Sequence, residues 1–141
     1  MKQLNILAVL FSIFIALPAS LTAGTLDQQG KEWLDAQKNP AALNVNGDWD
    51  SEFGNLHLSQ TSGNRDVNGI SGGYTITGVV SGKSLFLLFS MGGSVEYCAT
   101  LNYDSDSGMI GTYSNRVSRF HKKTGLCQGL NKSRPMYIKK K

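Results

Sequence analysis

The chain is poor in the side chains on which most enzymes and metal proteins depend, with two histidines and two cysteines among 141 residues. Cys98 and Cys127 lie far apart, and with His57 and His121 as the other soft ligands they match no zinc-site spacing. Their positions suggest no Ser-His-Asp or Cys-His arrangement. We therefore expect no bound metal, no cofactor and no catalytic residue, and the sequence does not favour an enzyme.

Long apolar runs are also scarce. The longest, Ile6–Leu17, is shorter than the roughly 20 residues that a membrane-spanning helix needs. Lys2 precedes this run and "PASLTAG" follows it, which is the pattern of a secretory signal peptide cleaved after Ala23 or Gly24. An uncleaved anchor is the alternative. We expect residues 1–23 to be a signal peptide and the protein to be secreted or periplasmic rather than membrane-spanning.

The two cysteines leave a single disulfide pairing. Export permits disulfides, and Cys98 with Cys127 is the one pair that the sequence offers. The bond would close a loop of about 30 residues and stabilise the fold by roughly 3.5 kcal/mol in the chain-entropy model. We therefore predict this disulfide.

Acidic residues are missing from the last part of the chain. From Met109 to Lys141 there are nine basic residues and no acidic one, whereas Gly24–Gly108 holds four basic and ten acidic residues. One interpretation is a solvated face that balances the acidic part of the fold, and the other is a surface for an anionic partner. This candidate basic surface consists of Arg116, Arg119, Lys122, Lys123 and Lys132. Nucleic acid is not expected as the partner, because the segment lacks interleaved aromatic residues.

Helical spacing is confined to one segment. Residues 25–38, "TLDQQGKEWLDAQK", predict a short helix with Thr25 as its N-cap and Trp33 as an anchor on the main body. Asn39-Pro40 ends the helix, because the residue before a proline is driven out of helical geometry. We expect residues 24–46 to form this helix and a linker, and residues 47–141 to form a β-domain.

From Gly47 onward apolar and polar residues alternate in short runs separated by glycine, asparagine and serine. About eight strands in sequential order predict an all-β fold, a small antiparallel up-and-down barrel that leaves no exposed edge. A sandwich of two sheets is the alternative. The run "SLFLLFS" is apolar on both faces, unlike the other predicted strands.

Three carboxylates in "GDWDSEF" raise the question of acid–base chemistry. Asp48, Asp50 and Glu52 recur every second residue, about 7 Å apart along a strand, which would suit a pair of catalytic carboxylates. However, they oppose the face that carries Trp49 and Phe53. We therefore expect them to face water and to have no catalytic role.

"GDW" at the start of the first predicted strand, followed by a meander, resembles the calycin group of barrels, which includes lipocalins, fatty-acid-binding proteins and avidins. The interval from Trp49 through "GNLHL" to "GGYT" is most similar to the first three strands of avidin and streptavidin. The chain also resembles generic exported bacterial Gly-Trp barrel modules without an assigned function. In the calycin group the tryptophan plugs one barrel end beneath a basic side chain, and the resemblance implies these roles for Trp49 and Arg134.

The resemblance to avidins implies a small ligand in the open end of the barrel, with biotin as the family's ligand. The implied site consists of Ser51, Asn55, Tyr74, Phe89 and Tyr113. Tyr74 matches the tyrosine that binds the ureido group, whereas Phe89 and Tyr113 stand at two positions of the family's tryptophan box. Ile76 stands where the family has a hydroxyl residue, so one hydrogen-bond partner of biotin is missing.

Two functions follow as hypotheses. The first is a secreted or periplasmic, non-catalytic protein that holds a small-molecule ligand in an avidin-like barrel. The second is an interaction module, including the hydrolase-inhibitor type, whose basic C-terminal surface binds an anionic envelope component or another protein. Either function is compatible with a homo-oligomer.

Overall fold

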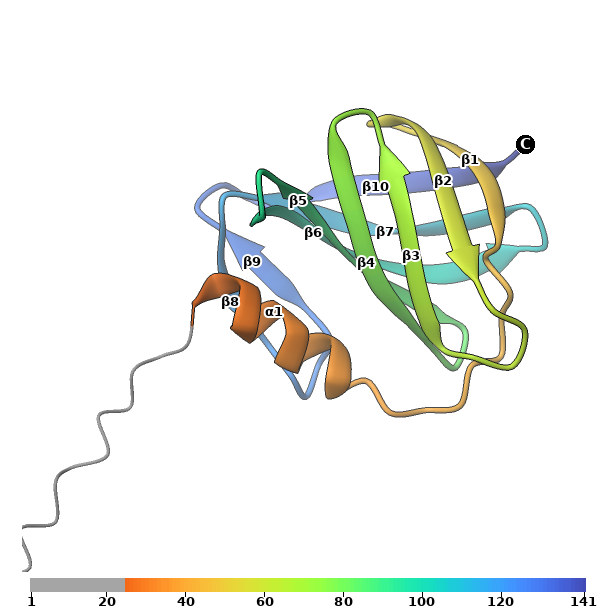
Figure 1. The fold of residues 1–141 in the computed structure, drawn as a ribbon, viewed down its shortest axis with the longest axis horizontal. Helices are drawn as coiled ribbons and strands as arrows, with labels where there is room; N and C mark the ends of the chain where they lie inside the picture. Colours follow the sequence, from red (N-terminus) through yellow and green to blue (C-terminus); the bar gives the residue numbers. More distant parts are fainter. Residues whose placement is uncertain (1–24) are drawn as a thin grey trace, which may run out of the picture.

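The computed structural model describes residues 25–141, and the predicted signal peptide lies outside these residues (Figure 1). Among residues 25–141 no helix has the length and hydropathy of a membrane span. The described chain forms one helix and ten strands, in the order α1 (Leu26–Asp35), β1 (Gly47–Ser51), β2 (Gly54–Gln60), β3 (Asp66–Ser71), β4 (Tyr74–Ser81), β5 (Ser84–Met91), β6 (Ser94–Ser105), β7 (Gly108–Asn115), β8 (Val117–Phe120), β9 (Cys127–Gly129) and β10 (Arg134–Lys140).

Eight of these strands close into an antiparallel barrel with the order β1-β10-β7-β6-β5-β4-β3-β2 (Figure 1). Strands β1 to β7 follow one another around the barrel, and β10 fills the place between β7 and β1. Strands β8 and β9 form a separate two-stranded sheet. The predicted all-β up-and-down barrel with a short N-terminal helix is therefore confirmed, and the sandwich alternative does not apply.

Apolar side chains fill the interior of the barrel, because alternate residues of each strand point inward. On β2, for example, Leu56 and Leu58 are fully buried while His57 between them is exposed. The interior cluster contains Val45, Trp49, Leu56, Leu58, Val67, Ile76, Val80, Leu85, Leu87, Phe89, Ala99, Leu101, Met109, Met136 and Ile138.

Helix α1 covers the outer face of the barrel at β4, β5 and β6, which explains why β5 is apolar on both faces. Phe86 and Leu88 point outward from β5 and pack beneath the helix. Trp33 is fully buried, with its ring 5.5 Å from that of Phe86, and it serves as the predicted anchor. Gly30 allows this close approach, since a Cβ atom there would lie 2.9 Å from Leu88 Cδ1.

The ends of α1 follow from local chemistry. The Thr25 side chain accepts a hydrogen bond from Gln28 N at 3.3 Å, so Thr25 is the N-cap that the sequence predicts. Asp27 in the first turn accepts a hydrogen bond from Val95 N at 2.9 Å, which ties the helix to β6. The helix ends at Asp35, three residues earlier than the predicted segment 25–38.

The segment between β7 and β10 contains the hairpin of β8 and β9. A disulfide between Cys98 and Cys127, with an S–S distance of 2.07 Å, joins β9 to the outer face of β6, and the predicted pairing is confirmed. Phe120 at the end of β8 packs against Trp33, with 5.2 Å between the ring centroids. The hairpin and α1 therefore lie side by side on the barrel wall (Figure 1).

Candidate functional site

The end of the barrel that carries the β1–β2, β3–β4 and β5–β6 turns is closed by a group of aromatic rings. We call this group the barrel mouth: Phe53, Tyr74, Phe89, Tyr97 and Tyr113. Of the residues expected to bind a ligand, Tyr74, Phe89 and Tyr113 therefore do lie together. Phe89 is fully buried, whereas the three tyrosines are partly exposed.

Phe53, which the resemblance did not assign to the site, occupies the centre of the mouth. Its ring stacks on Phe89 at a centroid distance of 4.9 Å and meets the edges of Tyr97 and Tyr113, each at 5.0 Å. The tight β1–β2 turn places it there, because Ser51 Oγ accepts a hydrogen bond from Phe53 N at 3.0 Å and donates one to Gly54 O at 2.9 Å. Phe53 thus fills the centre of the mouth, where the resemblance implies a ligand.

Asn55, which the resemblance also assigns to the site, lies outside the mouth. It immediately precedes the inward-facing Leu56, so it is exposed on the outer face of β2 beside Asp48. Tyr74 Oη donates a hydrogen bond to Glu96 Oε2 at 3.3 Å. Desolvation, together with the neighbouring Tyr97 and Glu96, raises the pKa of Tyr74 to about 12, so its hydroxyl stays protonated at neutral pH.

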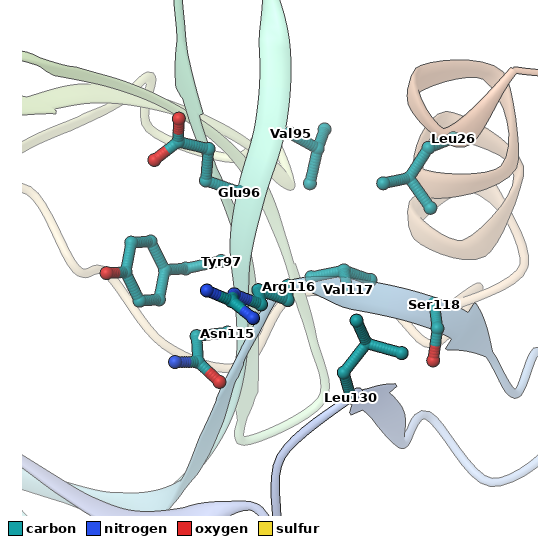
Figure 2. A pocket seen from close by; sticks show the side chains of 9 residues that line it. All are labelled: Leu26, Val95, Glu96, Tyr97, Asn115, Arg116, Val117, Ser118 and Leu130. Atoms are coloured by element: carbon teal, nitrogen blue, oxygen red, sulfur yellow. The ribbon is translucent and has the colours of Figure 1, made fainter.

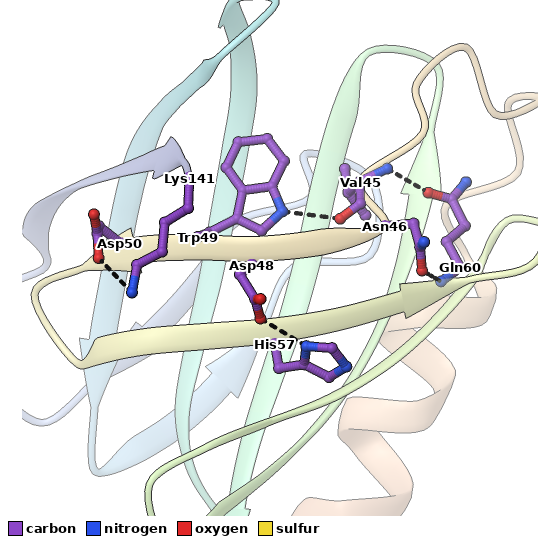
Figure 3. Close-up of polar contacts among 8 residues, drawn as sticks. All are labelled: Val45, Asn46, Asp48, Trp49, Asp50, His57, Gln60 and Lys141. Carbon is purple, nitrogen blue, oxygen red and sulfur yellow. Dashed lines mark hydrogen bonds and ion pairs between the residues drawn. The ribbon is translucent and has the colours of Figure 1, made fainter.

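Trp49 is buried in the barrel and its indole Nε1 donates to Val45 O at 2.9 Å (Figure 3). The cation over its ring is Lys140, 5.8 Å from the centroid, and not the expected Arg134. The strand register explains this difference, since Lys140 is directly opposite Trp49 on β10. Arg134 begins β10 at the other end of the barrel, opposite Tyr113.

The three carboxylates at the start of the barrel are exposed, and each has a partner. Asp48 Oδ1 lies 2.7 Å from His57 Nδ1, and this hydrogen bond lowers the pKa of Asp48 (Figure 3). Asp50 pairs with Lys141 at 3.3 Å, and Glu52 accepts a hydrogen bond from Tyr137 N at 3.1 Å. They contact separate partners on the outer surface, and all three are exposed to water as the sequence predicts.

The five residues of the basic surface are all exposed, and they lie on or beside the β8–β9 hairpin. Arg119 belongs to β8, Lys122 and Lys123 to the turn before β9, and Lys132 to the segment that leads into β10. Within the part of the chain that the structure describes, the ion pair made by this group is Lys122 with Glu32 of α1, at 3.0 Å. The other four cations have no carboxylate partner among residues 25–141.

Arg116 lies at the junction of β7 and β8 and has a backbone φ of 47°, a conformation that L-residues rarely adopt. Its side chain lines a groove of about 680 Å³ outside the barrel, between the first turn of α1 and the β8–β9 hairpin (Figure 2). The groove combines apolar residues with one cation and one carboxylate, and it is lined by Leu26, Val95, Glu96, Tyr97, Asn115, Arg116, Val117, Ser118 and Leu130. No pattern of the sequence alone indicated this groove, because the four stretches of chain that line it meet only in the fold.

Among residues 25–141, no group of three or more His, Cys, Asp or Glu side chains is placed to hold a metal ion. Comparison of the chain with protein-family models, with curated proteins and with solved structures gave no match.

Proposed function

We propose that the protein is a non-catalytic interaction module of an oxidising compartment outside the cytoplasm, and that its basic surface binds an anionic component of the cell envelope. The observation that carries this proposal is the attachment of the basic hairpin to the barrel wall by Cys98–Cys127. A disulfide of this kind persists where thiols are not kept reduced. The barrel and α1 then act as the scaffold for the hairpin.

The charge distribution supports an anionic partner. Four of the five cations of the basic surface have no carboxylate partner among the described residues, and the segment from Met109 to Lys141 contributes no acidic residue. Clustered charge of one sign raises the local concentration of oppositely charged partners and accelerates their association. The hairpin is also fixed, so little conformational freedom is lost on binding.

Charge reversal tests this function. The variant Lys123→Glu/Lys132→Glu should lose most of its retention on a polyanion such as dextran sulfate at low salt, because the net charge of one surface falls by four units. Lys83→Glu/Lys139→Glu makes the same change in net charge at exposed residues outside the hairpin and should retain binding. Equal retention of the two variants would contradict a specific basic surface.

A second candidate function is the binding of a small ligand at the barrel mouth, in the manner of an avidin-like barrel. The partial exposure of Tyr74, Tyr97 and Tyr113 around Phe53 favours it, since aromatic rings with a few polar groups are typical of ligand pockets. The ligand would have to displace the Phe53 ring. A rise in melting temperature with biotin or with a compound from a metabolite panel would support this function, whereas unchanged melting throughout would count against it.

A further inference from the structure

The β8–β9 hairpin exposes two leucines among its cations. Leu126 immediately precedes β9 with 51 % of its surface exposed, and Leu130 immediately follows it with 72 %, the highest value among the exposed large apolar residues of the described chain. Between them, Cys127 is buried in the disulfide. The hairpin therefore presents an apolar side chain at each end of a strand whose middle is attached to the barrel.

Cations lie next to both leucines. Leu126 O accepts a hydrogen bond from His121 N at 2.8 Å, which closes the turn that carries Lys122 and Lys123. Leu130 N donates to Arg116 O at 3.1 Å, so Arg116 is the neighbour of the second leucine. Arg119 is paired with Gln128, between the two. The surface is thus amphipathic, with leucines and cations side by side.

The backbone that carries these side chains is attached to the barrel at several points. Gly125 in the turn lies against the barrel wall, where a Cβ atom would be 2.6 Å from the ring of Phe86. Its carbonyl accepts a hydrogen bond from Thr100 Oγ1 at 2.7 Å. Together with the disulfide, these contacts hold the turn and β9 against the barrel wall, and both leucines are exposed to solvent.

We propose that this face of the hairpin docks on an anionic lipid bilayer, with Leu126 and Leu130 inserted at the interface and the surrounding cations at the headgroups. This inference rests on the proposed function and names its partner. A soluble polyanion would contact the cations and leave the leucines in water, whereas a bilayer would contact both. Apolar side chains beside Lys and Arg are typical of surfaces that bind at membrane interfaces.

The test is co-sedimentation of the full chain with phosphatidylcholine vesicles, with and without phosphatidylglycerol. We expect binding only when phosphatidylglycerol is present, and we expect Leu126→Ser/Leu130→Ser to weaken it by about tenfold while retention on dextran sulfate stays unchanged. Ile110→Ser is the matched control, since Ile110 has the same exposure as Leu126, 51 %, but lies on β7 outside the hairpin. This control should bind like the wild type.

The outcomes separate the two proposals. Retention on dextran sulfate without binding to phosphatidylglycerol vesicles would overturn the bilayer inference and leave the proposed function standing, with a polysaccharide or an acidic protein as the partner. Equal vesicle binding by Leu126→Ser/Leu130→Ser and the wild type would also overturn it. Loss of both kinds of binding in the wild type would overturn the proposed function as well.

A second measurement reports insertion directly. In Leu126→Trp the added indole should shift its emission to shorter wavelength and be quenched by brominated lipid when phosphatidylglycerol vesicles are added. The native Trp33 and Trp49 are buried and give a constant background. Ile110→Trp should show neither change, and equal quenching of both variants would contradict docking through the hairpin.

Discussion

Glu52 Oε1 accepts a hydrogen bond from the backbone N–H of Tyr137 at 3.1 Å, across the seam at which the barrel closes. Strands β1 and β10 are paired only at Trp49↔Lys140 and Asp50↔Lys139, so the first half of β10 has no strand partner on this side. The carboxylate of Glu52 satisfies an N–H group that β1 is too short to reach. Pro135 lies two residues before Tyr137, so its backbone nitrogen faces the same edge, because backbone groups alternate along a strand. Proline has no N–H, so no further acceptor is needed at that position.

The seam contact predicts a small and specific loss of stability. Glu52→Ala should lower the free energy of unfolding by about 1 kcal/mol, because the Tyr137 N–H loses its acceptor at a partly solvated site. Glu52→Gln retains an acceptor oxygen and should lie within a few tenths of a kcal/mol of the wild type. Urea denaturation measures both, and an unaltered midpoint for Glu52→Ala would show that water replaces the carboxylate.

The disulfide should account for a larger share of stability. Cys98→Ala/Cys127→Ala is expected to lower the free energy of unfolding by about 3 kcal/mol, because the loop between the two residues is no longer closed in the unfolded chain. The hairpin should also loosen before the barrel unfolds, so the β8 and β9 amides should exchange faster than those of β5. Uniform exchange rates across hairpin and barrel would indicate that packing alone holds the hairpin.

Removal of Phe53 should open the barrel mouth. Phe53→Ala loses the stack on Phe89 and the edge contacts with Tyr97 and Tyr113, which we expect to cost about 2 kcal/mol for this partly buried ring. Thermal unfolding measures the loss, with the exposed Ile110→Ala as a control of little effect. If a small compound stabilises Phe53→Ala and not the wild type, Phe53 excludes ligands from the mouth.

The Asp48–His57 pair predicts a titration shift. The hydrogen bond from His57 lowers the pKa of Asp48 below its ordinary value of 3.8, so in His57→Ala the pKa of Asp48 should rise towards that value. A lowered pKa in the folded state contributes stability above the ordinary pKa of the carboxyl, and this contribution is lost as the pH falls through the lowered value. Carbon-detected NMR titration of the Asp48 carboxyl measures the shift, and identical midpoints in the two proteins would contradict it.

The barrel could be predicted from the sequence because the side chains of each strand point alternately into the filled interior and out to water. Leu56 and Leu58 with His57 between them are the plainest case. The same logic explains why β5 is exceptional, since Phe86 and Leu88 are covered by α1. Trp33 could be recognised as the anchor because it is a large aromatic residue in an amphipathic helix.

Features that depend on register and long-range packing were not accessible. Whether Arg134 or Lys140 covers Trp49 is decided by how β10 pairs with β1. A register shift between Phe89 and Ser90 changes the pairing with β6, and Val95 packs in the outer cluster beneath α1. The β8–β9 hairpin was missed because its strands are short and rich in exposed polar residues.

The most direct test of the central claim is to map the binding surface by amide chemical shifts as dextran sulfate is added to the oxidised protein. The account predicts shifts confined to residues 116–134, strongest around Arg116, Arg119 and Lys123, and abolished by Lys123→Glu/Lys132→Glu. Shifts centred instead on Phe53 and Tyr74 at the barrel mouth, or spread evenly over all exposed lysines, would contradict it.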